Sequence, residues 1–251
     1  MENSKIMNGA GLFYFEGNQI GILAIHGGGG GTAADLKPLA EELHKREGFT
    51  IKVPLLPGYG TSPEDLRTTS LDEWKSFLEQ EIAELRNKCE KIIVGGHSMG
   101  GVLTLILAAQ HNFDCIFTIS TPTGLKGFVH KLVPLFKIFL KYYPVDSEQL
   151  KEDTDGQWVG YDKIPLNIAP KIKTLIKEMN KALPKIKCPI IAFQGRLDEV
   201  IKTSSMDTII ESVNSTIKRK VWLEHQDHPI LKSPDHNVII QELIKFLNKI
   251  L

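Results

Sequence analysis

The chain has 251 residues, of which 42% are hydrophobic, so it can bury a sizeable core and is not expected to be disordered. Lys plus Arg number 30, the same as Asp plus Glu, which excludes a general charge field that would attract nucleic acid or an anionic membrane. No apolar run reaches the roughly 18 residues of a membrane span, and the first residues lack the pattern of a signal peptide.

Three scattered cysteines, Cys89, Cys115 and Cys188, lack metal-ligand spacing and are typical of free thiols in a reducing compartment. We therefore expect a cytoplasmic protein, a monomer or weak homodimer, that binds no metal and no nucleic acid and does not insert stably into a membrane.

The first half of the chain alternates strand and helix patterns. Residues 12–27 predict a hairpin that turns at Gly17-Asn18 and continues as a buried strand from Ile20 to Ile25. The patterns that follow are a helix over 33–47, a strand over 49–56, a turn-rich stretch over 57–63, a helix over 71–88, a strand over 91–96, an apolar helix over 99–110 and a strand over 115–120. Short buried strands alternating with helices predict an α/β fold whose mostly parallel sheet is covered on both faces.

This alternation breaks over residues 121–187. The segment has helix-like pieces at 128–143 and 169–183 but no convincing strand, so we interpret it as an insertion at the carboxyl edge of the sheet. The alternation then resumes with a strand over 188–195, a helix near 203–212, a strand over 218–224 and a last helix over 235–251. We therefore predict a core domain of residues 1–120 and 188–251, interrupted by the insertion.

The motif Gly96-His97-Ser98-Met99-Gly100 matches G-x-S-x-G and lies between a predicted strand and a predicted helix. Such a turn strains the serine backbone and exposes its hydroxyl, and glycines on either side let the neighbouring backbones pass without a clash. The alternative is an ordinary flexible strand–helix turn. We favour a nucleophile, which then needs a base and a third group that orients the base.

The base and the acid should follow the nucleophile in the order acid, then histidine. Of the eight histidines, only His225, His228 and His236 lie far enough downstream. We favour His228, which is farther into its loop than the reserve candidate His225, whereas His236 is expected in the last helix. For the acid we favour Asp198, just after a buried strand, with Glu199 as the alternative.

Five consecutive glycines, residues 27–31, lie between a predicted strand and a helix. A phosphate-binding loop would need a Lys-Ser/Thr pair after them, and a dinucleotide site would need an acid after the second strand; both are absent. An oxyanion hole fits Ser98 better, with one backbone N–H from Met99 and one from this loop. We favour Gly28 as the loop donor, with Gly27 and Gly29 as alternatives.

Together, "HGG" after a strand, "GHSMGG", "YDKIP", "PKIKCPIIAFQGRLDEVI" and the late "HQDHPI" resemble the α/β-hydrolase superfamily, and within it the bacterial carboxylesterase and monoacylglycerol lipase branch. The resemblance covers nearly the whole chain. It implies an α/β-hydrolase fold with Ser98, Asp198 and His228 as nucleophile, acid and base, and with Gly28 and Met99 as oxyanion donors. Relatives often have a bulkier residue at the position of Gly28, so we expect a roomier acyl end here.

The resemblance also implies that residues 121–187 form a small cap over the acyl pocket. The alternative for their apolar side chains is packing of the cap onto the core. The candidate substrate-binding residues are Gly27, Gly29, Phe128, Leu132 and Leu135.

These observations predict a serine ester hydrolase that works through an acyl-enzyme intermediate, without metal or cofactor. The expected substrates are short- to medium-chain monoesters, with monoacylglycerols as a further candidate. The alternatives are a thioesterase, lactonase or other acyl hydrolase with the same triad, a ligand-binding protein without catalysis, and an interaction protein that docks through the apolar insertion.

Overall fold

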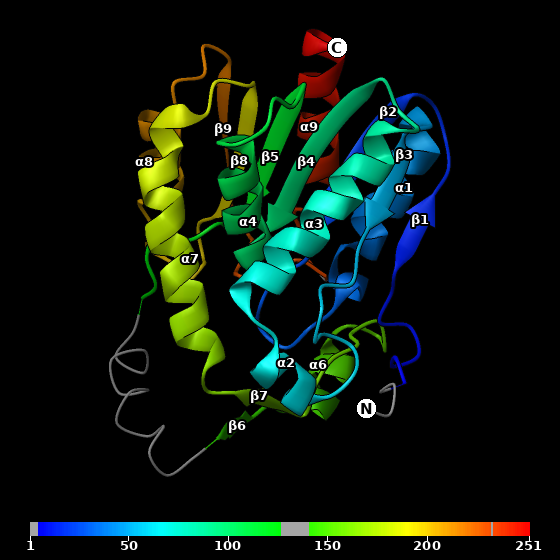
Figure 1. Ribbon diagram of the computed structural model, residues 1–251, viewed down its shortest axis with the longest axis vertical. Coiled ribbons are helices and arrows are strands. Elements are labelled where there is room, and N and C mark those ends of the chain that lie inside the picture. Colours follow the sequence, from blue (N-terminus) through cyan, green and yellow to red (C-terminus); the bar gives the residue numbers. More distant parts are fainter. Residues whose placement is uncertain (1–4, 127–140, 232) are drawn as a thin grey trace.

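The computed structural model describes residues 5–126, 141–231 and 233–251. Within these ranges the main sheet has seven strands in the order β1-β3-β2-β4-β5-β8-β9 (Figure 1). Their bounds are β1 Phe13–Phe15, β2 Ile20–Ile25, β3 Thr50–Val53, β4 Lys91–His97, β5 Cys115–Ile119, β8 Ile190–Gly195 and β9 Lys218–Leu223. β1 is antiparallel to β3 and all other neighbours are parallel, as predicted for most of the sheet.

Helices cover both faces of this sheet. The bounds are η1 Ala33–Leu36, α1 Lys37–Glu47, α2 Pro63–Thr68, α3 Leu71–Arg86, α4 Met99–Ala108, α6 Ser147–Asp153, α7 Ile168–Ala182, η2 Leu183–Lys185, α8 Ser205–Ser212 and α9 His236–Ile250. Helices α1 and α9 share one buried cluster, and α3, α4, α7 and α8 share the other. In Figure 1, α3, α4 and α7 lie in front of the strands, and α1 and α9 lie behind them.

Strand β2 is apolar on both of its faces because helices cover the sheet on both sides. Ile22 and Ala24 belong to the cluster with α1 and α9, whereas Leu23 and Ile25 belong to the cluster with α3 and α4. Successive side chains of a strand point to opposite faces, so a strand covered on both sides has no solvent-facing position. The predicted α/β architecture is confirmed.

The hairpin predicted for residues 12–27 is wrong. β1 pairs with β3 and not with β2, which lies on the other side of β3. The Gly17-Asn18 linker instead passes over the start of β3: Asn18 N–H donates to Gly48 O at 2.6 Å, and Gly17 N–H donates to Thr50 Oγ1 at 2.9 Å. A Cβ on Gly17 would lie 2.1 Å from Gly48 O, so the glycine permits this close crossing and not a two-residue turn.

The expectation of no strand in residues 121–187 is also wrong. β6 (Tyr142–Pro144) and β7 (Lys163–Pro165) form an antiparallel pair, and each has only three residues, too few to show a period in the sequence. The helical piece predicted at 169–183 is α7 with the start of η2, whereas most of the piece at 128–143 lies outside the described residues.

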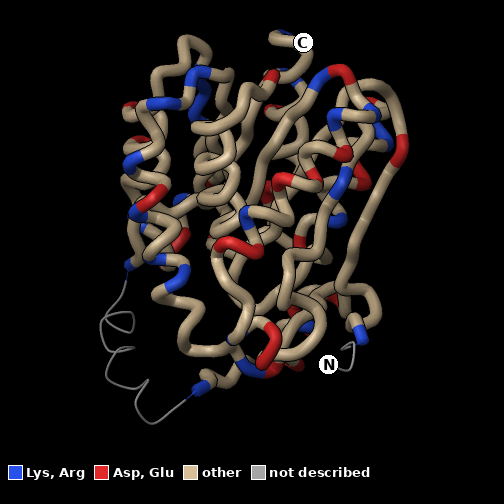
Figure 2. Tube along the Cα trace, in the orientation of Figure 1, with Lys and Arg blue, Asp and Glu red and all other residues tan. Residues whose placement is uncertain are grey.

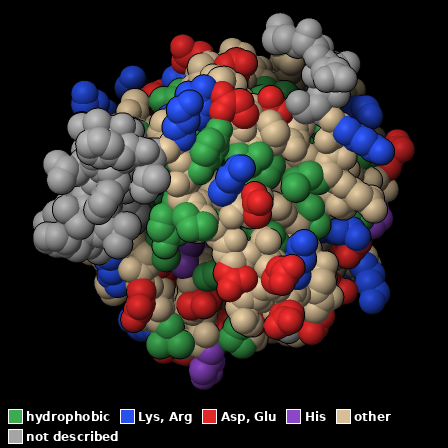
Figure 3. All heavy atoms as spheres, turned by 90° about the horizontal axis from the view of Figure 1, so that it is seen from below, with side chains coloured by type: hydrophobic (Ala, Val, Ile, Leu, Met, Phe, Trp, Pro, Cys, Tyr) green, Lys and Arg blue, Asp and Glu red, His purple; other side chains and the backbone are tan. Residues whose placement is uncertain are grey.

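The carboxyl edge of the sheet carries the short elements β6, α6 and β7, which gather with α2 at the lower end of Figure 1. Helix α2 was not predicted, although Ser62 caps it through a bond from Asp65 N–H and Pro63 occupies its first turn. Seen from below in Figure 3, this end shows hydrophobic side chains in several patches between acidic and basic ones.

Basic and acidic residues are interspersed along the trace in Figure 2, in keeping with their equal numbers. Among the described residues, no helix has the length and apolar character needed to cross a bilayer.

Candidate active site

The predicted nucleophile, acid and base and the glycine loop all follow strands of the parallel part of the sheet. The glycine loop (residues 27–31) follows β2, Ser98 follows β4, Asp198 follows β8 and His228 follows β9. Because the carboxyl ends of parallel strands meet at one edge, segments that are far apart in the chain come together there.

Ser98 lies at a sharp bend between β4 and α4. Its φ of 53° and ψ of −117° are unusual for a non-glycine residue, and its N–H donates to Ile119 O at 2.9 Å. A Cβ on Gly96 would lie 2.5 Å from Gly100 C, and one on Gly100 would lie 2.0 Å from Ile25 O. The bend costs on the order of 1–3 kcal/mol in strain and depends on both glycines, which let α4 start against β2.

The structure brings the three predicted residues of the relay (Ser98, His228 and Asp198) into contact. His228 Nε2 lies 2.9 Å from Ser98 Oγ, and His228 Nδ1 lies 2.8 Å from Asp198 Oδ2. Asp198 Oδ1 accepts the N–H groups of Val200 at 2.9 Å and Ile201 at 3.1 Å, which directs Oδ2 toward the histidine. A carboxylate only accepts, so Nδ1 carries the proton and Nε2 is free to accept the serine proton.

The Asp198 carboxylate is charged at neutral pH. Its side chain is fully buried, 0% exposed, and burial acts to raise its pKa. The hydrogen bond and charge interaction with His228, together with the two backbone N–H groups, outweigh that effect and hold the pKa of Asp198 below its usual value. A charged acceptor is what the positive form of the His228 ring requires.

The alternative candidates lie outside this relay. The His225 side chain is 77% exposed, and its Nδ1 lies 3.4 Å from Asp235 Oδ1. His236 is the first residue of α9, and Glu199 is exposed to solvent.

The space beside Gly28 is occupied. A Cβ on Gly28 would lie 2.8 Å from Met99 Sδ and 3.1 Å from Ile172 Cδ1, and the Tyr59 hydroxyl donates to Gly28 O at 3.3 Å. The expected extra room is therefore not present here, because Ile172 of α7 and Met99 take the place of a larger side chain at residue 28.

The other glycines of the loop have different surroundings. A Cβ on Gly27 would lie 3.1 Å from His97 Nδ1 and 3.5 Å from Ser98 Cβ, whereas one on Gly29 would have no heavy atom within 4 Å. Gly27 is therefore next to the serine and Gly29 faces open space. The candidates Phe128, Leu132 and Leu135 lie outside the described residues.

His26 holds the glycine loop and has no role in the sequence-based prediction. It is fully buried, its Nδ1 donates to Gly27 O at 2.9 Å, and its Nε2 accepts Leu56 N–H at 3.1 Å. Burial lowers the pKa of His26 to about 4, so the ring is neutral and can both donate and accept. Its position at a strand end, directly before the glycines, is the signal that could have found it.

Residues from 121–187 also bind this loop. Tyr161 N–H donates to Gly30 O at 3.0 Å, and Thr32 Oγ1 donates to Val159 O at 2.8 Å. A Cβ on Gly30 would lie 2.8 Å from Ile164 Cγ1. The loop after β2 is thus packed between the sheet edge and the inserted segment.

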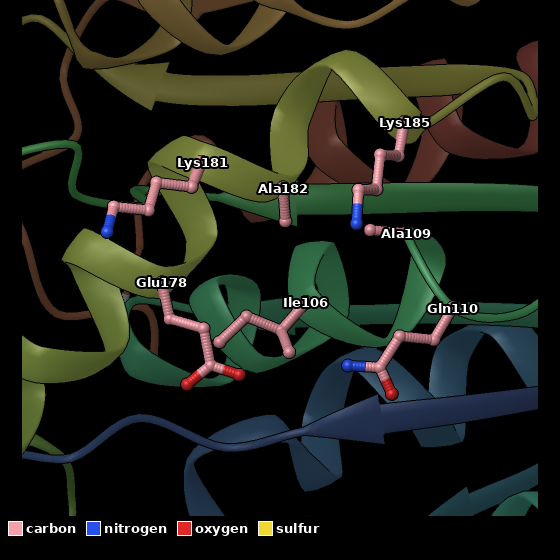
Figure 4. A pocket seen from close by; sticks show the side chains of 7 residues that line it. All are labelled: Ile106, Ala109, Gln110, Glu178, Lys181, Ala182 and Lys185. Carbon is pink, nitrogen blue, oxygen red and sulfur yellow. The ribbon is translucent and has the colours of Figure 1, made fainter.

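No group of three or more His, Cys, Asp or Glu residues in the described ranges is arranged to hold a metal ion. A separate pocket of about 260 Å³ lies between α4 and α7, and Ile106, Ala109 and Lys185 are among the residues that line it (Figure 4). Ile106 is eight residues beyond Ser98, roughly 12 Å along the α4 axis, so this pocket does not belong to the relay.

Comparison with known proteins places the chain in a family. The sequence model of the family described as serine aminopeptidase, S33, matches residues 17–235. The chain belongs to this family. The thermostable monoacylglycerol lipase of Bacillus sp. strain H-257 is 30% identical to it, over 99% of this chain and 98% of the relative. The carboxylesterase of Bacillus subtilis strain 168 is 26% identical, over 95% and 96%.

Solved structures agree with this family assignment. A structure from the work on LipS and LipT, two metagenome-derived lipolytic enzymes, has a TM-score of 0.87 at 25% identity and covers 98% of this chain and 100% of that chain. The monoacylglycerol lipase of Paleococcus ferrophilus shares the fold, with a TM-score of 0.71 at 19% identity over 94% and 99%. The predicted α/β-hydrolase fold, the resemblance to the carboxylesterase and monoacylglycerol lipase branch, and the assignment to the serine hydrolases are confirmed.

Proposed function

We propose that this member of the serine aminopeptidase family hydrolyses short- to medium-chain carboxylic monoesters, including monoacylglycerols, with Ser98 as nucleophile. The observation that carries the proposal is the continuous relay, with 2.9 Å from Ser98 Oγ to His228 Nε2 and 2.8 Å from His228 Nδ1 to Asp198 Oδ2. A serine hydroxyl becomes an effective nucleophile when an oriented histidine can take its proton.

The proposed reaction has two halves. Ser98 Oγ attacks the ester carbonyl while His228 Nε2 takes its proton, and the backbone N–H groups of Gly28 and Met99 stabilise the oxyanion. The alcohol leaves with the proton from His228, and the acyl group stays on Ser98. Water then attacks the acyl-enzyme while His228 takes its proton; as the acyl–Oγ bond breaks, His228 returns this proton to Ser98 Oγ and the acid is released. Asp198 holds the ring orientation and stabilises its positive form throughout.

The proposed substrate class rests on two supports. Two full-length relatives carry the names monoacylglycerol lipase and carboxylesterase. The side chains that a Cβ on Gly28 would meet, those of Met99 and Ile172, are apolar and suit an acyl chain. Contacts of Ile164 and Ile172 with the glycine loop support the proposal that residues 121–187 cap the site.

The cellular setting is a part of the same proposal. Cys89 and Cys115 are buried and Cys188 is half-buried, and all three are free thiols, which supports a cytoplasmic location. The oligomeric state, a monomer or weak homodimer, stays a prediction, and the molecular mass from analytical ultracentrifugation tests it.

The test compares wild type with Ser98→Ala on p-nitrophenyl esters of increasing chain length and on 1-monoacylglycerols. Wild type should hydrolyse the esters and react with a fluorophosphonate probe, and Ser98→Ala should do neither. Ser120→Ala is the matched control, because Ser120 also has a positive φ, 46°, and also follows a strand of the same sheet directly, and it should behave as wild type.

Aminoacyl p-nitroanilides provide the contrasting substrate, since the family description is that of an aminopeptidase. Faster turnover of these amides than of any ester would contradict the proposed substrate class. Fluorophosphonate labelling that persists in Ser98→Ala would contradict the proposed nucleophile.

A further inference from the structure

Three consecutive main-chain carbonyls around His228 accept hydrogen bonds from just two side chains. Gln226 Nε2 donates to Asp227 O at 3.0 Å and also to Pro229 O, and His97 Nε2 lies 2.8 Å from His228 O. Both side chains are buried, since Gln226 is 1% exposed and His97 is 6% exposed. The loop that carries the proposed base is therefore held from inside the protein.

The protonation of His97 follows from its partner. A carbonyl oxygen only accepts, so His97 Nε2 carries the proton, and Nδ1 is buried without a hydrogen-bond partner. Burial, and then the neighbouring His228 ring, lower the pKa of His97 to about 3. A neutral ring at this place adds no positive charge beside the imidazolium that forms on His228 during turnover.

His97 and Ser98 are adjacent in the chain and bind opposite ends of the same residue. His97 binds the main-chain carbonyl of His228, while Ser98 Oγ meets the ring at Nε2, and the two histidine rings are 5.2 Å apart between centroids. Residue 228 is thus fixed at two points to the end of β4. Any shift of the β9 loop against β4 would change both contacts together.

Gln226 connects the same loop to the loop of the acid. Leu197 N–H donates to Gln226 O at 3.1 Å, and a Cβ on Gly195 would lie 2.2 Å from Gln226 O. The main chain of Gln226 therefore packs on the end of β8 and binds Leu197, one residue before Asp198, while its side chain binds the carbonyls on either side of His228.

We propose that His97 and Gln226 are positioning residues, which hold the main chain of His228 so that its ring meets Ser98 and Asp198 at once. The proposal rests on the proposed function, in which His228 is the base. Both side chains are buried, so we expect neither to touch the substrate. Their effect should be on kcat and not on KM, because a displacement of about 1 Å in a reacting group can cost on the order of 10²-fold in rate.

Three substitutions at residue 97 separate the hydrogen bond from the packing. His97→Phe keeps a ring but has no donor. His97→Gln places an amide N–H at the position of Nε2, whereas His97→Asn places it at the position of Nδ1, because the Asn side chain is one carbon shorter. The matched control is His44→Phe, since His44 Nδ1 donates to Phe49 O at 2.8 Å at the amino end of β3, away from the relay.

On p-nitrophenyl butyrate we expect kcat of His97→Phe and His97→Asn to fall about 10- to 100-fold, with KM within about twofold of wild type. His97→Gln should recover most of kcat, and His44→Phe should match wild type. Gln226→Met, which keeps length and loses the donor, should lower kcat in the same way as His97→Phe. Circular dichroism and thermal unfolding verify that each variant is folded.

Equal kcat in His97→Phe and His44→Phe would overturn the proposal, and so would a His97→Gln variant as slow as His97→Asn. If His97→Phe does not fold, the proposal is still tested by comparing kcat of His97→Gln with kcat of His97→Asn, and by kcat of Gln226→Met. Failure of the proposed function has a different signature, namely full activity of Ser98→Ala, and that result would overturn both.

Discussion

Replacement of Asp198 by Asn changes one oxygen of the relay to an NH₂ group and keeps the shape of the side chain. Asp198 Oδ1 accepts the N–H groups of Val200 and Ile201, so the new amide must keep its oxygen at that position. Its NH₂ group then faces His228 Nδ1 in place of Oδ2. A ring nitrogen that faces a donor must be unprotonated, so the proton of His228 moves to Nε2, opposite Ser98 Oγ.

In that tautomer His228 cannot accept the proton of Ser98. We expect kcat of Asp198→Asn to fall about 10⁴-fold, the loss that the wrong tautomer causes in Ser-His-Asp enzymes. At about 1.36 kcal/mol for each factor of ten, this corresponds to roughly 5.4 kcal/mol of transition-state stabilisation. The number of hydrogen bonds at the side chain is unchanged, so the variant should stay folded.

The assay is p-nitrophenyl ester turnover by wild type, Asp198→Asn and the matched control Glu199→Gln, with thermal unfolding of each. Glu199 is adjacent and exposed, so its substitution should leave kcat unchanged. An Asp198→Asn variant that keeps more than about a tenth of wild-type kcat would refute the tautomer argument. A large loss of kcat in Glu199→Gln, with little loss in Asp198→Asn, would identify Glu199 as the acid.

Further predictions concern packing, pH and selectivity. Gly100→Ala places a Cβ 2.0 Å from Ile25 O and should cost about 3 kcal/mol, seen as a lower urea midpoint; an unchanged midpoint would contradict the close approach of α4 to β2. Because folding lowers the pKa of His26 from 6.5 to about 4, the unfolded chain binds a proton in this window that the folded protein does not, so stability should fall as pH drops from 6.5 to 4. Urea midpoints at pH 7 and pH 5 measure this, and His26→Asn should show a smaller difference. Ile172→Ala should shift kcat/KM toward longer acyl chains by roughly tenfold, whereas Ile164→Ala should not, and identical chain-length profiles would exclude Ile172 from the acyl subsite.

The bend at Ser98 could be predicted because its glycine motif is local. Gly96 and Gly100 lie two residues to either side, and a Cβ on Gly96 would meet Gly100 C within the same turn, whereas a Cβ on Gly100 would meet Ile25 O of β2. The choice of Asp198 and His228 used a similarly local signal, because a residue in the loop after a buried strand reaches the carboxyl edge of a parallel sheet.

The pairing of β1 could not be predicted in this way. The Gly17-Asn18 dipeptide is typical of a turn, but the same two residues also permit a close crossing over the start of β3. Which strand becomes the partner depends on β3, which is farther along the chain than β2. Local turn chemistry limits the backbone conformation and does not select a partner.

The amino-acid sequence by itself determined the α/β alternation, the serine bend and the glycine loop, since each depends on residues close together in the chain. Only the tertiary structure decided that His97 and Gln226 hold the carbonyls around His228 and that Ile172 fills the space beside Gly28. The physical reason is that buried polar groups need hydrogen-bond partners and interiors are closely packed, so both depend on which side chains are close in space. Which group is nearest is set when the sheet brings distant loops to one edge.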